Sequence, residues 1–241
     1  MLFTNKKFIQ NKIIYFARKM NSFGLNQGSS GNISIRFHDG MLITPTSIPS
    51  ENLRPNDIVY MDLKELSTNK AENYNLTCKK SPSSEWRMHS SILKNRRDIN
   101  AVLHCHSIHA TALACHRKNI PSFHYMTAIA GSMDIICSDY ATFGTEELSR
   151  NALRALEGRY ACLMANHGQL SIGENIEKAF SLAIEVETLS HIYLEACKLG
   201  EPKHLSQSEM KNILVKFKKL SYKYASNKDN DNQRPKLYTN D

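Results

Sequence analysis

Three histidines stand at the ends of short apolar runs, where their side chains could converge on a metal ion. His104 and His106 flank Cys105 directly after an apolar run at 101–103. Residues i and i+2 of a strand face the same side, so both imidazoles would share one face while Cys105 points into the core. His167 follows a second apolar run and could complete a three-imidazole set, as in open catalytic zinc sites. The spacing alone also fits hydrogen-bonded core histidines or a solvent-exposed face.

Three segments rich in small and hydroxyl side chains could contact an anion. Residues 81–86 open a predicted helix with consecutive serines, and free N–H groups at a helix N-terminus suit a phosphate. The loops at 26–32 and 44–47 can present further N–H and hydroxyl groups. Ser84 would equally be an ordinary helix cap, and Glu85 suits the first turn of any helix. Together with the histidines, these segments suggest a phosphorylated substrate beside a metal.

Hydrophobic spacing and glycine or proline punctuation predict the elements that must position these residues. Helices are expected over 5–23, 84–95, 107–117, 145–157, 174–199 and 206–220. Extended segments are expected over 33–37, 41–44, 57–61, 101–106, 132–137, 160–166 and 168–172. Helices and strands mix without strict alternation, which favours one domain with a central mixed or antiparallel sheet. Residues 67–82 read as a polar excursion, and the polar composition of 225–241 predicts a disordered tail.

Composition narrows the class of protein. The 241 residues are 41% hydrophobic, enough for a sizeable core without disulfides, and the six cysteines form no CxxC pair. The net charge of +8 is concentrated in residues 1–24 and 203–223, away from the motifs, which indicates solvated helix faces rather than a nucleic-acid partner. Apolar runs are too short for a membrane span, and no secretory signal is recognisable. We therefore expect a cytoplasmic protein with buried free thiols.

Taken together, the segments resemble class II sugar-phosphate aldolases of the aldolase/adducin family. The matching runs are GLNQGSSGN, DGMLITPTSIP, SPSSEWRMH, AVLHCHSIHATA, IPSFHYM, YATFGTEELS and NHG, in the family order across roughly residues 5–200. The resemblance implies a single α/β/α layered domain with a central, mostly antiparallel sheet over residues 1–224, followed by the tail at 225–241. It also implies a four-fold cyclic homotetramer whose active sites lie at subunit interfaces.

The resemblance further implies a metal site. One Zn²⁺ ion per subunit would be held by His104, His106 and His167. Glu85 would be a fourth ligand in the resting enzyme and the proton-transferring base once substrate displaces it. Zinc is then the expected cofactor, and a phosphorylated sugar the expected partner.

Other positions match substrate-binding residues of the family. Tyr125 matches the tyrosine that reaches a neighbouring subunit's site and protonates the aldehyde oxygen, and Phe143 matches an aromatic residue lining that site. Ser47 stands where the family usually has glycine. The positions that match phosphate-binding residues are Asn32, Thr46, Ser83 and Ser84.

The implied reaction is reversible cleavage of a ketose 1-phosphate, such as L-fuculose 1-phosphate, to dihydroxyacetone phosphate and an aldehyde such as L-lactaldehyde. Zinc acts as the Lewis acid, so no lysine Schiff base is required. Aldolases of 5-deoxy- or 5-methylthio-pentulose 1-phosphates share this chemistry and are the main alternative. A family epimerase, which carries Asp at the position of Glu85, and a family dehydratase are further alternatives. Adducin-like structural modules lack the metal ligands that this chain retains.

The C-terminal segment departs from the family pattern. Relatives that cleave fuculose phosphate carry a tyrosine just after a Phe-Lys pair, and it covers the neighbouring site. Here Phe217-Lys218 leads into Lys219 and Leu220, and the nearest tyrosines are Tyr222 and Tyr224. We therefore expect the zinc and phosphate half of the site to match the family, and the aldehyde half to differ.

Overall fold

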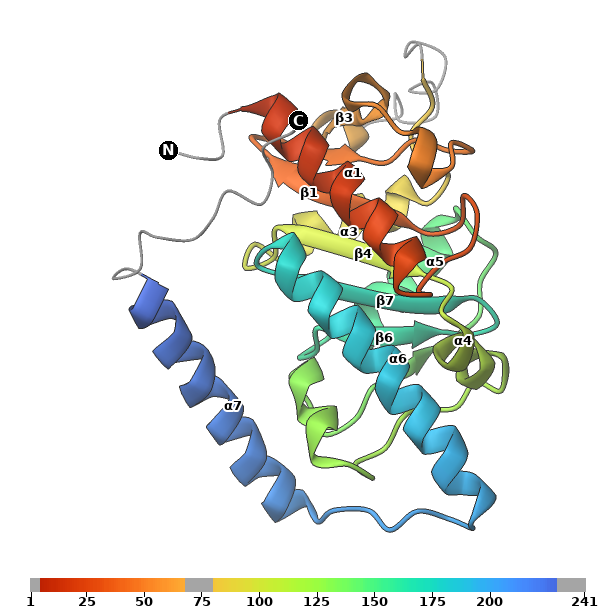
Figure 1. The fold of residues 1–241 in the computed structure, drawn as a ribbon, viewed down its shortest axis with the longest axis vertical. Coiled ribbons are helices and arrows are strands. Elements are labelled where there is room, and N and C mark those ends of the chain that lie inside the picture. The colour runs from red at the N-terminus through yellow and green to blue at the C-terminus, as the bar shows by residue number, and fades with distance from the viewer. Residues whose placement is uncertain (1–4, 68–79, 229–241) are drawn as a thin grey trace.

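A sheet of seven strands forms the middle layer of the protein in the computed structural model, which describes residues 5–67 and 80–228 (Figure 1). Its strand order is β3-β2-β1-β4-β7-β6-β5. The strands are β1 (Asn32–Phe37), β2 (Gly40–Ile43), β3 (Val59–Asp62), β4 (Ala101–Cys105), β5 (Cys137–Ser138), β6 (Ala161–Met164) and β7 (Gly168–Gly173). All neighbouring pairs are antiparallel except β5 and β6, which confirms the expected mostly antiparallel sheet.

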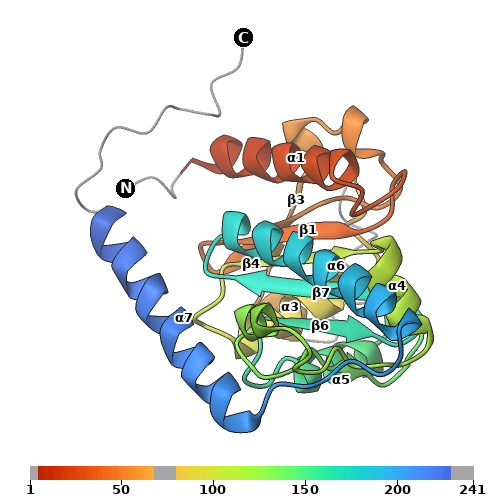
Figure 2. The same ribbon diagram turned by 60° about the horizontal axis from the view of Figure 1, so that its bottom comes forward.

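Helices cover both faces of this sheet. Helices α1, α4 and α6 pack on one face, and α3 and α5 pack on the other (Figures 1 and 2). The α-helices are α1 (Lys6–Ser22), α3 (Trp86–Asn95), α4 (Ile108–Cys115), α5 (Glu146–Ala155), α6 (Ile176–Lys198) and α7 (Gln207–Lys228). Short 3₁₀ helices are η1 (Ser50–Asn52), η2 (Pro55–Asp57), η3 (Glu65–Ser67) and η5 (Tyr125–Ala130). The arrangement is the expected α/β/α layered fold.

Strand β4 lies at the centre of the sheet and is buried on both faces. Cys105 belongs to the apolar cluster under α1 and α6, whereas Val102 belongs to the cluster under α3 and α5. Successive side chains of a strand alternate between faces, so His104 shares the face of Val102. Pairing with β1 and β7 places Asn32 and Leu170 opposite His104 on either side. The alternation of side chains along β4 therefore directs the imidazole of His104 toward α3.

The expected strand over 132–137 is wrong. Only Cys137 and Ser138 form a strand, and Ile135 makes a single bridge to Ile120. Asp134 instead forms an ion pair with Arg159, with 2.6 Å between Arg159 Nη2 and Asp134 Oδ1. This ion pair holds the segment as a loop. The preceding 3₁₀ helix η5 was not predicted. The apolar pattern at 132–137 therefore reflects burial of Ile135 rather than pairing of the whole segment in the sheet.

The C-terminal helix is longer than predicted. Helix α7 was expected to end near 220 but continues to Lys228, since its sequence contains neither glycine nor proline. It therefore extends into the range 225–241 that we expected to be disordered. Residues 229–241, like most of the polar excursion at 67–82, lie outside the described residues, so the domain boundary stays a prediction. Within the described ranges, no helix has both the length and the apolar character needed to cross a membrane.

Candidate active site

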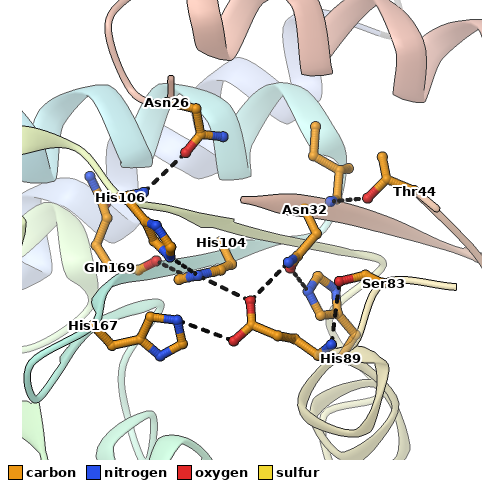
Figure 3. Close-up of polar contacts among 11 residues, drawn as sticks. Asn26, Asn32, Thr44, Ser83, His89, His104, His106, His167 and Gln169 are labelled. Carbon is orange, nitrogen blue, oxygen red and sulfur yellow. Dashed lines mark hydrogen bonds and ion pairs between the residues drawn. The ribbon is translucent and has the colours of Figure 1, made fainter. Parts of the chain in front are cut away.

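The three histidines expected to bind metal meet at one end of the central strands. His104 is fully buried in β4, His106 follows the end of that strand, and His167 lies in the turn between β6 and β7 (Figure 3). One ring nitrogen from each lies within 4.8 Å of the others. The backbone N–H of His106 donates to Asn26 Oδ1 at 3.0 Å, which fixes the chain beyond the strand.

The turn that carries His167 is held by neighbouring backbone. Asn166 has a positive φ of 54°, a conformation that asparagine tolerates better than most residues. Its N–H donates to Ala114 O at 2.9 Å, and its Oδ1 accepts from Arg117 Nε at 3.1 Å. Gly168 follows, and a Cβ there would lie only 2.5 Å from Cys105 O. Close packing of β7 against β4 thus brings His167 next to His104.

The hydrogen bonds of His104 determine which of its nitrogens faces the site. His104 Nδ1 lies 2.9 Å from Gln169 O, a carbonyl that can only accept, so Nδ1 carries the proton. The unprotonated Nε2 then faces His106 Nε2 at 2.9 Å and Glu85 Oε2 at 3.2 Å. The Gln169 side chain donates to Ser107 Oγ at 2.7 Å and to Ala183 O at 3.1 Å. These contacts hold Gln169 in place, and its backbone carbonyl fixes the orientation of the His104 ring.

Glu85 enters the site from the start of α3. We expected Ser84 in the capping position, but the helix begins at Trp86 and Glu85 occupies the N-cap. Its side chain makes no cap bond and points instead to the histidines. Oε2 accepts from Asn32 Nδ2 at 2.9 Å, and Oε1 lies 3.2 Å from His167 Nε2. Oε1 is buried and receives no hydrogen bond from the described residues.

Burial sets the protonation of these groups. Burial lowers the pKa of His104 to about 3, so its ring is neutral at neutral pH. Burial and the adjacent His167 ring also lower the pKa of His106. For Glu85, burial raises the pKa, but the facing His104 and His167 and the Asn32 amide outweigh it and lower the pKa to about 2. The Glu85 carboxylate therefore faces the neutral ring of His104.

This arrangement fits a divalent cation. Three imidazole nitrogens and a buried carboxylate converge here, and a cation between them would offset their desolvation. Imidazole and carboxylate ligands suit zinc. Cys105 does not compete, since it faces the opposite side of the sheet and burial raises its thiol pKa to about 12. His104, His106, His167 and Glu85 are therefore the residues that could hold such an ion.

A cavity of about 360 Å³ opens beside the histidines. Two backbone bonds join the loops that form its wall: Ser83 N donates to Thr44 O at 3.0 Å, and Thr46 N donates to Ser81 O at 3.1 Å. Ser47 lies at a φ of +61°, in the left-handed region that favours glycine. All four residues matched to phosphate contacts line this cavity: Asn32, Thr46, Ser83 and Ser84.

Two predicted aromatic residues lie differently with respect to the cavity. Phe143 lines it and is 66% exposed. Tyr125, in η5, is 53% exposed and is not among the residues lining the cavity of its own chain. Tyr140, which we did not predict, also lines the cavity, with the Arg117 guanidinium 6.0 Å from its ring centre. The chain therefore does not bring Tyr125 to its own site.

Sequence reasoning missed three further polar residues at the site. Asn26 lies in the quoted small-residue loop and Gln169 follows the NHG run, so both were adjacent to recognised motifs. His89 lies four residues after Glu85, and this spacing places both on one face of a helix. That spacing was the available signal for His89.

Comparison with known proteins gives consistent results. The model of the family described as Class II Aldolase and Adducin N-terminal domain matches residues 11–194. A 5-methylthioribulose-1-phosphate/5-deoxyribulose-1-phosphate aldolase of Rhodospirillum rubrum is 45% identical over 87% of this chain and 91% of its own. An L-fuculose phosphate aldolase of Escherichia coli is 44% identical over 87% and 94%. A solved L-fuculose 1-phosphate aldolase superposes with a TM-score of 0.79 at 39% identity, covering 87% of this chain and 96% of that one.

Proposed function

Because the chain belongs to the class II aldolase and adducin family, we propose that it is a zinc-dependent aldolase that reversibly cleaves a ketose 1-phosphate to dihydroxyacetone phosphate and an aldehyde. The enzyme is an aldehyde-lyase that acts on phosphorylated sugars. The observation that carries the proposal is the cluster of three imidazole nitrogens within 4.8 Å of one another, with the buried Glu85 carboxylate 3.2 Å from His104 and from His167. Adducin-like structural relatives would not need this arrangement.

Each residue then has a defined task. His104, His106 and His167 would hold a zinc ion, and the bound ion would supply Lewis acidity to the substrate carbonyl. In condensation, the Glu85 carboxylate, which its low pKa keeps ionised, would remove a proton from C3 of dihydroxyacetone phosphate. In cleavage, the electron pair of the broken bond between C3 and C4 stays with C3, and the carboxyl of Glu85 in its protonated form would return that proton.

The phosphate group of the substrate is assigned to the hydroxyl- and amide-lined end of the cavity. Asn32 and Ser83 are buried there, whereas Thr46 and Ser84 are exposed. The N–H groups at the start of α3 point their positive end toward the same region. We assign Phe143 to the substrate lining.

The aldehyde end is proposed to be completed by a neighbouring subunit of a homotetramer. Tyr125 is half exposed and lies outside the cavity of its own chain, which suits a residue that serves another chain. In condensation its phenol would donate a proton to the aldehyde oxygen, and in cleavage the corresponding phenolate would take the proton of the C4 hydroxyl. Both proton transfers are then accounted for, one at each carbon of the broken bond.

Two substrate types remain in competition. The 45% identical relative is named for 5-methylthioribulose and 5-deoxyribulose 1-phosphates, and the 44% identical relative for L-fuculose phosphate. Both types of substrate would present the same phosphate group and metal-binding oxygens to the enzyme. They differ only at the end of the sugar farthest from the phosphate.

The direct test is an aldol-cleavage assay against a panel of ketose 1-phosphates, with dihydroxyacetone phosphate as the measured product. We expect dihydroxyacetone phosphate from at least one of the two substrate types. We also expect activity to vanish after chelation and to return with zinc. A fully active, metal-free preparation would overturn the zinc assignment, and absence of cleavage across the panel would overturn the aldolase assignment.

A further inference from the structure

A chain of buried hydrogen bonds leads from Glu85 through Asn32 to His89, and Figure 3 shows Asn32 and His89 apart from the three histidines. Ser34 Oγ lies 2.7 Å from His89 Nδ1, and His89 Nε2 lies 2.5 Å from Asn32 Oδ1. Asn32 Nδ2 then donates to Glu85 Oε2 at 2.9 Å. Ser34 and His89 are completely buried. Neither has a task in the reaction described above.

The donor and the acceptor of each hydrogen bond in this series follow from Glu85, its last residue. Asn32 Nδ2 lies 2.9 Å from Glu85 Oε2, and a carboxylate oxygen accepts, so Asn32 presents its NH₂ group to Glu85. Asn32 Oδ1 therefore faces His89, and His89 Nε2 must donate. Burial lowers the pKa of His89 to about 4, so its neutral ring carries one proton and Nδ1 accepts from the Ser34 hydroxyl. No member of the chain has an alternative orientation.

The four hydrogen-bonded residues also link strand β1 to the start of helix α3, with two residues on each element. Asn32 and Ser34 are alternate residues of β1 and share one face of the strand. Glu85 and His89 are separated by one turn at the start of α3 and share one face of the helix. The amide of Asn32 thus lies between a fixed ring and a fixed carboxylate.

We propose that His89, oriented by Ser34, is a positioning residue that locks the Asn32 amide with its NH₂ group toward Glu85 and the substrate cavity. This inference rests on the proposed aldolase function. Asn32 Nδ2 has two hydrogens, one bound to Glu85, and the residue lines the cavity assigned to phosphate. A rotated amide would place Oδ1 against the carboxylate and against the phosphate. Loss of His89 should therefore weaken both proton transfer and phosphate binding.

Two substitutions of similar polarity separate this role from packing. His89→Gln can keep a donor where Nε2 lies, whereas His89→Asn can keep an acceptor near Nδ1 but does not reach Asn32. Partners that orient the groups of a metal site typically contribute 10–100-fold to activity. We expect kcat/KM to fall by about that factor in His89→Asn, and by about threefold or less in His89→Gln. Equal losses in both variants would overturn the proposal.

Serine substitutions supply a second, independent pair. Ser34→Ala removes the donor that orients His89, and we expect kcat/KM to fall several-fold, with weaker affinity for inorganic phosphate measured by calorimetry. Ser190→Ala is the matched control, since Ser190 is also completely buried but donates only to Val186 O in its own helix, at 2.6 Å. Its kcat/KM and phosphate affinity should be unchanged. If Ser34→Ala behaves like this control, the proposed role of Ser34 is wrong.

A spectroscopic measurement on the wild-type holoenzyme does not depend on activity. Long-range ¹H–¹⁵N NMR spectra distinguish the protonated from the unprotonated ring nitrogen of each histidine. We expect His89 as the Nε2–H tautomer and His104, which donates through Nδ1, as the opposite tautomer. An Nδ1–H tautomer at His89 would overturn the positioning role. The expected tautomer together with no cleavage of any ketose 1-phosphate would count against the aldolase assignment alone.

Discussion

At the scale of single residues, the main feature of the site is the set of polar contacts around Glu85 and His104. Among the described residues, no hydrogen bond reaches the buried Glu85 Oε1, and His104 directs an unprotonated nitrogen toward His106 Nε2 and Glu85 Oε2. Buried polar groups are almost always hydrogen-bonded, so such a cluster is a candidate site for a cation. A bound cation would offset the desolvation of these groups.

Glu85→Gln tests the proposed base directly. The substitution keeps the size of the side chain but removes its basicity, so kcat should fall by about 10²–10⁴-fold. Steady-state kinetics on zinc-loaded protein measure the effect, with circular dichroism and zinc content as controls for folding and metal binding. Near-normal turnover in a folded, zinc-loaded variant would rule out proton transfer by Glu85.

The buried neutral His89 predicts a specific pH dependence of stability. Its pKa is about 4 in the folded protein against 6.5 for the free side chain, so the unfolded chain binds a proton first as pH falls. Stability is therefore lost as pH drops from about 6.5 toward 4, by about 2 kcal/mol at pH 5 from this group. Urea unfolding at pH 7 and pH 5 should show that His89→Gln is less pH-sensitive than wild type by about this amount. Equal sensitivity would contradict the buried neutral ring.

At the scale of elements, the helices and most strands followed from the sequence, because apolar periodicity reports burial. Strand β4 was predictable from its apolar run, and so was the shared face of His104 and its neighbours. The segment 132–137 was not, because burial against Ile120 and an ion pair to Arg159 replace ladder pairing there. The contact between His89 and Asn32 was also beyond prediction, since it depends on the crossing of α3 over β1.

The close approach of β7 to β4 predicts that Gly168→Ala disrupts the metal site. The new Cβ would lie 2.5 Å from Cys105 O and 3.3 Å from His104 Cε1, so β7 must move away. We expect a loss of about 1–3 kcal/mol in the free energy of unfolding, together with weaker zinc binding. Gly158→Ala is a suitable control, because its φ of +67° costs about 1 kcal/mol while nothing lies within 4 Å of the new Cβ. Zinc affinity should be normal in that variant, and a matching loss in both would exclude the steric explanation.

The loop between β2 and η1 offers the reverse test. Ser47 adopts a left-handed φ of +61° at the position where the resembling family usually has glycine. Ser47→Gly should raise the melting temperature slightly, by an amount corresponding to about 1 kcal/mol or less, since glycine adopts this conformation without steric cost. Phosphate affinity should change little, because Thr46 and Ser83 keep their backbone bonds. A clear loss of stability would mean that the Ser47 hydroxyl bond to Thr46, 3.3 Å long, outweighs the strain.

At the scale of the whole molecule, the proposal requires more than one chain per site. Tyr125 lies outside its own cavity, so a tetramer should allow two inactive variants to rescue each other. Chains carrying Tyr125→Phe and chains carrying Glu85→Gln, mixed after mild dissociation, should regain a fraction of the activity. Sedimentation measurements give the oligomeric state independently. A strictly monomeric and fully active protein would contradict the shared site.

The long sequence separations within the site have a consequence for folding kinetics. Glu85 meets Asn32 across 53 positions, His104 meets Gln169 across 65, and His106 meets Asn26 across 80. Contacts of this kind form late, because the loops between them must close first. A partly folded chain therefore has no complete set of ligands, and the ion can be captured only after β1, β4 and β7 have paired. Zinc should consequently slow unfolding while leaving the refolding rate almost unchanged.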